Sequence, residues 1–217
     1  MAPARLRVAS LQRYDYFPTP MWAFALEDHA HLDRGIAQLA TSLRAEDPAG
    51  LRRSNRRGWH SDLLARDRSP DLATLVELID DLALRIAQDL AWDLDSQRFA
   101  VDGLWINALG EGGYHERHRH ENAVLSGVYY VRVSQDAGAL VLEDPRPAAG
   151  MIQPRRAGVN PLSAASIRLE PEPGLLLIWP AWLPHRVDPN SSTETRISVS
   201  FNIPAVPRES PAHGIGV

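Results

Sequence analysis

The chain has 217 residues and a formal net charge of −4, and 44% of its residues are hydrophobic. This length suits one domain with appended elements, so we expect residues 1–217 to form a single domain. The charge argues against nucleic acid or an anionic membrane as a partner. The absence of cysteine excludes disulfides, thiolate metal sites and a cysteine nucleophile. No apolar run reaches the length of a signal peptide or a membrane span, so we expect a soluble, cytoplasmic protein.

Residues 1–98 are expected to contribute a short strand and two helices. A strand is expected at residues 6–10. Segment 14–22 should be extended, and its aromatic residues should pin this segment to the core. Asp28 is a candidate cap for a helix that ends near Arg44. A second helix should begin at Ser69 and Pro70 and present an apolar stripe through Leu90, which packs against the core.

Between these helices, residues 51–59 carry four arginines, at positions 52, 53, 56 and 57. Such a run is typical of a solvated loop. Contact with an acidic substrate or partner is the alternative.

After residue 98 the helical periodicity gives way to short β-like runs separated by turn residues. Many short strands with regular turns indicate a sandwich or barrel, so the fold class is α+β, mainly β. We expect residues 99–205 to form this core, with the N-terminal helices packed against it. The proline-rich residues 144–161 form a long loop that can act as a lid, and residues 206–217 form a loose tail. The expected strands are 99–109, 124–133, 139–143, 166–170, 175–179 and 195–203.

Three histidines, His115, His118 and His120, lie within six residues just before the expected strand 124–133. Alternate residues of a strand share a face, so His118 and His120 point the same way if strand geometry reaches back to them. Two imidazoles on one face make half of a metal site, which needs a third ligand from elsewhere. The alternative is a histidine-rich surface loop.

A third histidine ligand is available in His185. It follows a continuous apolar run, residues 175–179, and a turn that is stiffened by Pro180 and Pro184. The run is typical of a strand buried on both faces, and the turn would hold His185 in a fixed position. A structural histidine is the alternative.

The last expected strand carries Arg196 and Ser198 on one side. This polar side either faces water or lines the interior of a barrel. In the second case the two residues would hold a carboxylate, because a guanidinium grips a carboxylate through two parallel hydrogen bonds.

The ordered motifs HRH, SGVYYV, WPAWLPH and RISVSFNI resemble the Fe(II)- and 2-oxoglutarate-dependent oxygenases over about residues 105–203. The pattern is most similar to an uncharacterised bacterial and phage subgroup of that superfamily. The resemblance implies a double-stranded β-helix, a cupin-like jelly roll. It also implies Fe(II) as cofactor, 2-oxoglutarate as cosubstrate, and oxidation, most often hydroxylation, of a small-molecule or peptide substrate.

The resemblance also assigns roles to metal-binding residues. His118 becomes the first metal ligand and His185 the distal one. The family usually places an aspartate or glutamate where this chain has His120. We therefore expect either a three-histidine site or an oxygen ligand from Glu116 or Glu121, and we favour His120 because Glu121 would face away from His118 on an ideal strand. His115 is expected behind the ligands or facing the substrate.

For the cosubstrate, the resemblance makes Arg196 the partner of the far carboxylate of 2-oxoglutarate, helped by Ser198. Tyr130 is a candidate for the same role, with a core aromatic residue as the alternative. Asn107 is a candidate for the other end of the cosubstrate.

Two other functions remain open at this stage. A cupin-like metal enzyme that does not use 2-oxoglutarate would keep the histidines but would not need Arg196. A catalytically inactive jelly-roll binding module would bind metal or cosubstrate without turnover. The exposed barrel edges and the helical face are compatible with a homodimer.

Overall fold

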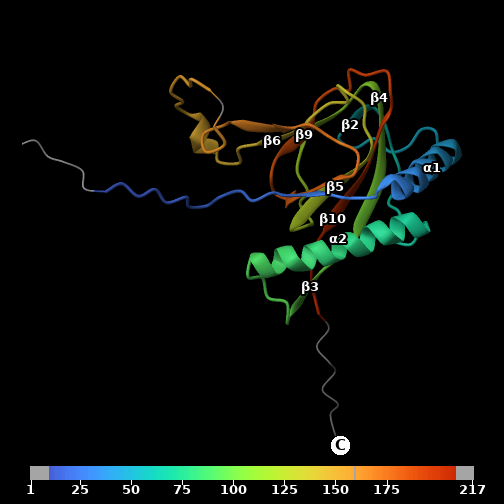
Figure 1. Ribbon diagram of the computed structural model, residues 1–217, viewed down its shortest axis with the longest axis horizontal. Coiled ribbons are helices and arrows are strands. Elements are labelled where there is room, and N and C mark those ends of the chain that lie inside the picture. The colour runs from blue at the N-terminus through green and yellow to red at the C-terminus, as the bar shows by residue number, and fades with distance from the viewer. Residues whose placement is uncertain (1–9, 159, 209–217) are drawn as a thin grey trace, which may run out of the picture.

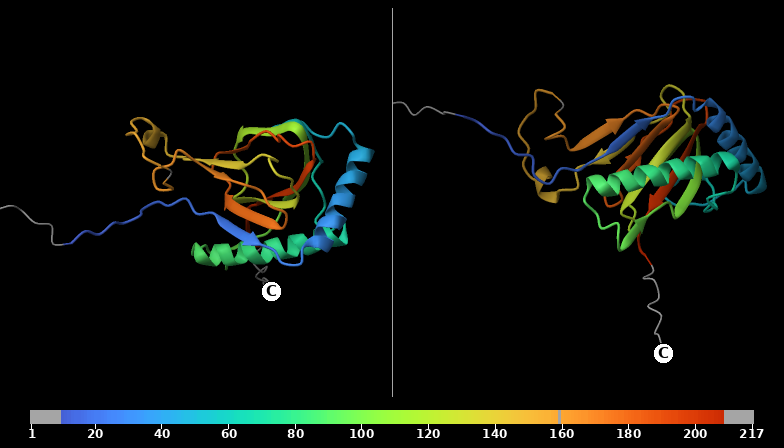
Figure 2. Two further views of the ribbon diagram at one scale, coloured as in Figure 1. Left: turned by 45° about the horizontal axis from the view of Figure 1, so that its top comes forward. Right: turned by 60° about the horizontal axis from the view of Figure 1, so that its bottom comes forward.

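The computed structural model describes residues 10–158 and 160–208 (Figure 1). Its centre is a nine-stranded antiparallel sheet that curls into a barrel, as Figure 2 shows, and this confirms the expected jelly roll. A two-stranded sheet pairs β3 with β11. The strands are β1 (Trp22–Ala25), β2 (Asn55–His60), β3 (Gln97–Phe99), β4 (Gly103–His118), β5 (Leu125–Arg132), β6 (Leu140–Glu143), β7 (Ser166–Leu169), β8 (Leu175–Pro180), β9 (His185–Val187), β10 (Arg196–Ile203) and β11 (Ala205–Pro207).

Strand β4 joins the two layers of the barrel. Its first part pairs with β10, whereas its end pairs with β9, which in turn pairs with β6. Strand β10 lies between β4 and β5, and β8 pairs with the other edge of β5. The start of β10 and the end of β4 therefore both lie beside the barrel interior.

Two helices, α1 (Ala30–Glu46) and α2 (Pro70–Asp89), lie against the outside of the barrel (Figures 1 and 2). The predicted cap of α2 is confirmed, because Ser69 Oγ accepts a hydrogen bond from the Leu72 backbone N–H. The predicted stripe is buried from Leu72 to Ile86 and packs against the outward-facing apolar residues of β4, β5 and β10. The stripe therefore has a packing role, as expected.

The expected cap of α1 is wrong. The helix begins after His29, and Asp28 has a left-handed φ of 52° that takes it out of the cap position. No side chain caps this helix; instead His29 Nδ1 lies 2.5 Å from the carboxylate of Asp33 in the first turn.

Residues 51–59 also differ from the expectation. Most of this segment forms β2, which pairs with β4 along the barrel wall, so a solvated loop is wrong. The arginine-rich composition hid a strand in which Asn55, Trp59 and His60 are buried.

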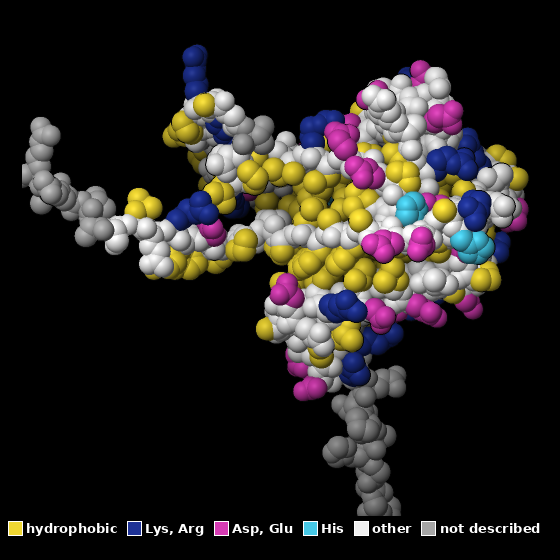
Figure 3. All heavy atoms as spheres, in the orientation of Figure 1, with side chains coloured by type: hydrophobic (Ala, Val, Ile, Leu, Met, Phe, Trp, Pro, Cys, Tyr) yellow, Lys and Arg dark blue, Asp and Glu magenta, His cyan; other side chains and the backbone are white. Residues whose placement is uncertain are grey.

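The aromatic segment 14–22 is not pinned to the core along its length. Tyr16 and Phe17 are 73% and 91% exposed, and Figure 3 shows hydrophobic side chains on the surface of this extended segment. Only its end joins the fold, where Trp22 opens β1 opposite Ile178 of β8.

The described residues 144–158 and 160–161 include a short 3-10 turn, η1 (Pro147–Gly150), and project away from the barrel (Figure 1). A lid role for this loop stays a prediction. The single domain with internal boundaries near residues 98 and 205 also stays a prediction. The expected strand at 6–10 lies almost entirely outside the described residues, as does the tail beyond residue 208. None of the described helices is long and apolar enough to cross a membrane.

Candidate active site

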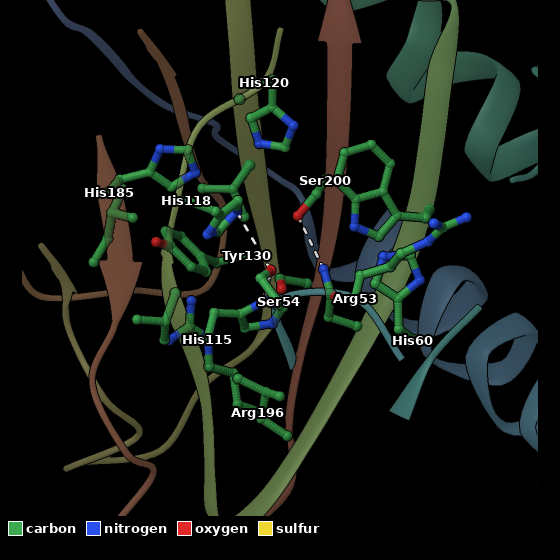
Figure 4. Close-up of a pocket in the computed structure, with 18 of the residues that line it drawn as sticks. Arg53, Ser54, His60, His115, His118, His120, Tyr130, His185, Arg196 and Ser200 are labelled. Carbon is green, nitrogen blue, oxygen red and sulfur yellow. Dashed lines mark hydrogen bonds between the residues drawn. The ribbon is translucent and has the colours of Figure 1, made fainter. Parts of the chain in front are cut away.

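The barrel encloses a cavity of about 450 Å³. Five histidines line it, together with two arginines and several apolar side chains, and Figure 4 shows them pointing into one space. No aspartate or glutamate is found among the described residues that line this cavity. The five histidines are His60, His115, His118, His120 and His185.

His118, His120 and His185 form a cluster that can hold a metal ion, because one nitrogen of each lies within 4.8 Å of the others. His118 ends β4 directly opposite His185, which opens β9. His120 lies beyond the strand, so strand alternation does not place it. Its backbone N–H instead donates to the Ala181 carbonyl in the turn after β8, which brings the third imidazole to the cluster.

Hydrogen bonds fix the tautomers of two histidines. His118 Nδ1 lies 2.7 Å from the Glu116 carbonyl oxygen, and His185 Nδ1 lies 2.9 Å from that of Leu183. A carbonyl only accepts, so both Nδ1 atoms carry the proton and both Nε2 atoms present a lone pair. His120 Nδ1 lies 3.4 Å from the side-chain amide of Asn202.

The cluster is uncharged in the protein. Burial lowers the pKa of His185 to about 3 and that of His120 to about 4, and in both cases the neighbouring His118 adds to the effect. Burial also lowers the pKa of His118. Neutral imidazoles are the form that binds metal, so the site is ready for a cation near pH 7.

The two glutamates that could have replaced His120 lie elsewhere. Glu116 and Glu121 are exposed and form salt bridges with Arg56 and Arg119 on the surface. The structure therefore brings neither carboxylate to the histidine cluster.

At another part of the cavity, Arg196 is buried and only 2% exposed. Its Nη1 donates to the Gly138 carbonyl oxygen at 2.6 Å, and its Cζ lies 4.9 Å from the centre of the Tyr130 ring. Arg196 Nε and the Tyr130 hydroxyl have no partner among the described residues, although both are buried. Unpaired buried donors are rare and costly, which indicates a place for an acceptor.

The polar side of β10 thus lines the barrel, and the alternative of a wet face is wrong. Ser198 is buried beside Arg196 and lines the same cavity. Burial lowers the pKa of Arg196 and raises that of Tyr130.

Asn107 and Trp179 also reach the cavity from β4 and β8. Asn107 Nδ2 donates to Ser200 Oγ at 3.0 Å, whereas its Oδ1 has no partner in the described chain. Trp179 Nε1 is likewise buried and without a partner.

Residues 103–202 match the model of a protein family described as "Putative 2OG-Fe(II) oxygenase". These residues form nearly the whole barrel and carry all three clustered histidines. Over this part of the chain, which is just under half of its 217 residues, the protein is similar to that family.

Solved structures share the fold of this chain. A prolyl-4-hydroxylase from Pseudomonas putida has a TM-score of 0.62 at 20% identity, over 86% of this chain and 92% of that one. A prolyl hydroxylase from Trichoplax adhaerens, in complex with a peptide of hypoxia inducible factor, has a TM-score of 0.59 at 15% identity, over 84% and 82% of the two chains. The epimerase SnoN, in complex with Fe³⁺, alpha ketoglutarate and nogalamycin RO, has a TM-score of 0.59 at 14% identity, over 92% and 88%. A comparison with curated protein sequences gives no match.

Several residues that line this cavity were not among the predicted site residues. Arg53 and Ser54 come from the segment 51–59 that was interpreted as a loop, and His60 follows it directly. Trp105 and Trp179 come from expected strands in which these two residues were given no role in the site. Ser54 Oγ lies 3.0 Å from Nδ1 of His115. The segment shows no two-residue alternation that could have placed it on the barrel wall, because Arg57 between the buried Asn55 and Trp59 is exposed and the register shifts there.

His115 lines the cavity beside His118 although the two residues are three apart. The register of β4 against β9 shifts between them, and this irregularity lets both side chains face inward. Burial, together with the neighbouring His118, holds the pKa of His115 well below its usual value.

Proposed function

We propose that this protein is an Fe(II)- and 2-oxoglutarate-dependent dioxygenase that oxidises a C–H bond of its substrate. Hydroxylation is the reaction that we expect. His118, His120 and His185 would hold the iron. The observation that carries the proposal is that a neutral histidine cluster and an unpartnered arginine–tyrosine pair share one barrel cavity.

The histidines fit Fe(II) chemically. Imidazole suits divalent iron, and three protein ligands leave positions open for a cosubstrate and oxygen. Bound iron with 2-oxoglutarate and oxygen supplies the oxidation. The chain holds two of the three imidazoles in the ligating tautomer through the carbonyls of Glu116 and Leu183, which keeps their Nε2 atoms unprotonated.

For His120 the corresponding partner is Asn202. Its amide would hold the Nδ1 proton if Oδ1 faced the ring and Nδ2 faced Ser126, an exchange that leaves the heavy-atom positions almost unchanged.

The end of the cavity beside Arg196 fits a carboxylate of 2-oxoglutarate. Arg196 Nε and the Tyr130 hydroxyl would donate to the far carboxylate, and Ser198 would add a third donor. Asn107 is proposed for the other end of the cosubstrate. It would donate through Nδ2 if its amide were turned, since the Ser200 hydroxyl can donate to Oδ1 as well as accept from Nδ2.

An apolar part of the cavity wall would keep water from the reacting atoms. Leu109, Val128 and Leu140 line the cavity and are buried. The chain therefore orients the cosubstrate and surrounds it with apolar groups.

The two other candidate functions account for less of the site. A cupin-like enzyme without 2-oxoglutarate gives no reason for the unpaired Arg196 and Tyr130 donors. An inactive binding module would bind both ligands but consume no oxygen.

The test adds Fe(II) and 2-oxoglutarate to the protein without oxygen and records the visible spectrum. We expect a weak charge-transfer band in the wild type, no band in Arg196→Ala, and succinate formation once oxygen is admitted. Iron binding without a band would favour the cupin-like enzyme, a band without succinate would favour the binding module, and no iron binding would refute the site.

The substrate class is addressed below. A homodimer and a cytoplasmic location are further proposals. Sedimentation would test the first and cell fractionation the second.

A further inference from the structure

The cavity has a second polar wall that the proposed iron and cosubstrate sites do not use. We call it the Arg53 wall, and it consists of Arg53, His60, Leu63 and Trp105. Figure 4 shows Arg53 and His60 across the cavity from His118 and His185. The wall therefore faces the proposed iron site from the opposite side.

The aromatic part of this wall is a stacked pair of rings. The His60 and Trp105 rings are nearly parallel, at 8° with their centres 5.5 Å apart. His60 Nδ1 lies 2.5 Å from the Ser61 carbonyl oxygen, so Nδ1 carries the proton and Nε2 is an acceptor. Burial lowers the pKa of His60, and the charge of Arg53 adds to this effect, so the ring is neutral.

Arg53 supplies a cation that no described residue neutralises. Its guanidinium takes part in none of the salt bridges or side-chain hydrogen bonds of residues 10–158 and 160–208. Arg56, by contrast, is paired with Glu116. Among the four arginines of the described segment 51–59, only Arg53 lines the cavity.

The charge balance of the cavity points to an anionic guest. Its described lining contains Arg53 and Arg196 but no carboxylate, and three imidazoles would leave both charges of Fe(II) in place. The two charges of 2-oxoglutarate offset only half of this positive charge. An anionic substrate would offset the rest. Uncompensated charge is costly beside the buried Arg196, whereas Arg53 is exposed at the rim of the cavity and is therefore free to pair with an incoming anion.

We propose that the Arg53 wall is the substrate subsite, and that it takes a small molecule with a carboxylate or phosphate group beside a planar or apolar body. The anion would pair with Arg53, and the body would lie along His60 and Trp105. A cavity of about 450 Å³ that also holds 2-oxoglutarate limits the inserted part to a small molecule or one side chain. Its role in catalysis rests on the proposed function, whereas the binding of an anion at Arg53 does not.

The experiment measures the binding of three probes to the full chain by equilibrium dialysis. The probes are phenylacetate, phenyl phosphate and the neutral phenylacetamide, and the protein is saturated with Fe(II) and 2-oxoglutarate without oxygen. We expect at least one anionic probe to bind more tightly than the amide. Arg53→Gln should weaken that binding about tenfold or more, because it removes a charge-assisted hydrogen bond.

Arg52→Gln is the matched control, because Arg52 is an exposed neighbour that does not line the cavity. It should bind the probes like the wild type, and Arg53→Lys should retain part of the affinity. The charge-transfer band of iron with 2-oxoglutarate should be unchanged in Arg53→Gln. The tighter anionic probe would identify the anion as carboxylate or phosphate.

Three results would overturn the proposal: equal affinity of Arg53→Gln and Arg52→Gln, equal binding of the amide, or no binding of either anion to the wild type. Competition between the anionic probe and 2-oxoglutarate would also overturn it, because the anion would then lie at Arg196. If the wild type gives no charge-transfer band, the oxygenase proposal fails by itself. Dialysis with the iron-free protein then still tests the Arg53 wall.

Discussion

At the scale of single residues, the unusual feature of this site is a third histidine in place of a carboxylate. Glu116 and Glu121 are close in sequence but pair with surface arginines. The proposed ligand set therefore adds no negative charge to the cavity. It depends instead on keeping the imidazoles neutral, which burial achieves.

Removing one proposed ligand should remove the iron. His118→Ala and His185→Ala should each lose stoichiometric Fe(II), a larger effect than the roughly 10–100-fold loss that follows removal of a group that orients a ligand. Metal analysis after anaerobic dialysis measures occupancy, and circular dichroism checks that the fold is kept. His31→Ala is the control, because that side chain is 86% exposed. Full occupancy in both ligand variants would refute the assignment.

The buried histidines should also make the stability of the iron-free protein depend on pH. In the unfolded chain a histidine gains its proton near pH 6.5, whereas folded His185 resists protonation down to about pH 3. The unfolded state then binds more protons, so the free energy of unfolding falls as the pH drops below about 6.5 and is unaffected by this group above it.

His185→Gln should make that decline shallower by up to about 1.4 kcal/mol per pH unit. Urea unfolding at several pH values between about 7.5 and 5 measures the slope for wild type and variant. Parallel slopes would show that His185 does not stay neutral in the folded protein.

At the scale of elements, the sequence predicted those strands whose apolar pattern is complete. The buried run of β8 and the alternation of β10 led directly to His185 and to the pair Arg196 and Ser198. Strand β2 was missed because its arginines dominate the composition, while its partner β4 supplies the pairing. His120 joins the cluster as the sequence analysis favoured, although a long-range backbone hydrogen bond places it there and strand alternation does not. A register shift in β4 turns His115 inward, and the sequence shows neither of these two causes.

A close approach of three strands makes one glycine of β5 essential. A Cβ at Gly127 would lie 2.6 Å from the Leu177 carbonyl oxygen of β8 and would also clash with the Phe201 ring of β10. Gly127→Ala should therefore destabilise the protein by about 1–3 kcal/mol, as overpacking does. Gly110→Ala is the matched control on β4, because nothing lies within 4 Å of its Cβ position. Thermal unfolding compares the two, and equal melting temperatures would contradict the packing of these strands.

At the scale of the whole molecule, the helices and the barrel interior have separate tasks. One apolar cluster joins α1 and α2 to the outer face of the barrel, and a second cluster lies within it beside Tyr130 and Trp179. The outer cluster holds β4, β5 and β10 in place, while the inner face carries the second cluster together with the polar groups of the cavity. The chain can thus keep unpaired donors in its interior without losing the contacts that stabilise the fold.

Ligand binding should accordingly raise the stability of the whole fold in two separable steps. Fe(II) alone should raise the melting temperature, and 2-oxoglutarate should raise it further; a ligand at 100 times its dissociation constant adds about 2.7 kcal/mol. Arg196→Met removes the proposed donors but retains much of the side-chain volume. In this variant Fe(II) should still raise the melting temperature, whereas 2-oxoglutarate should no longer raise it further. Anaerobic scanning fluorimetry measures both, with succinate as a control ligand that lacks the keto group. If Arg196→Met keeps the full 2-oxoglutarate increment, the cosubstrate binds elsewhere in the cavity, and the unpaired donors of Arg196 and Tyr130 need another partner.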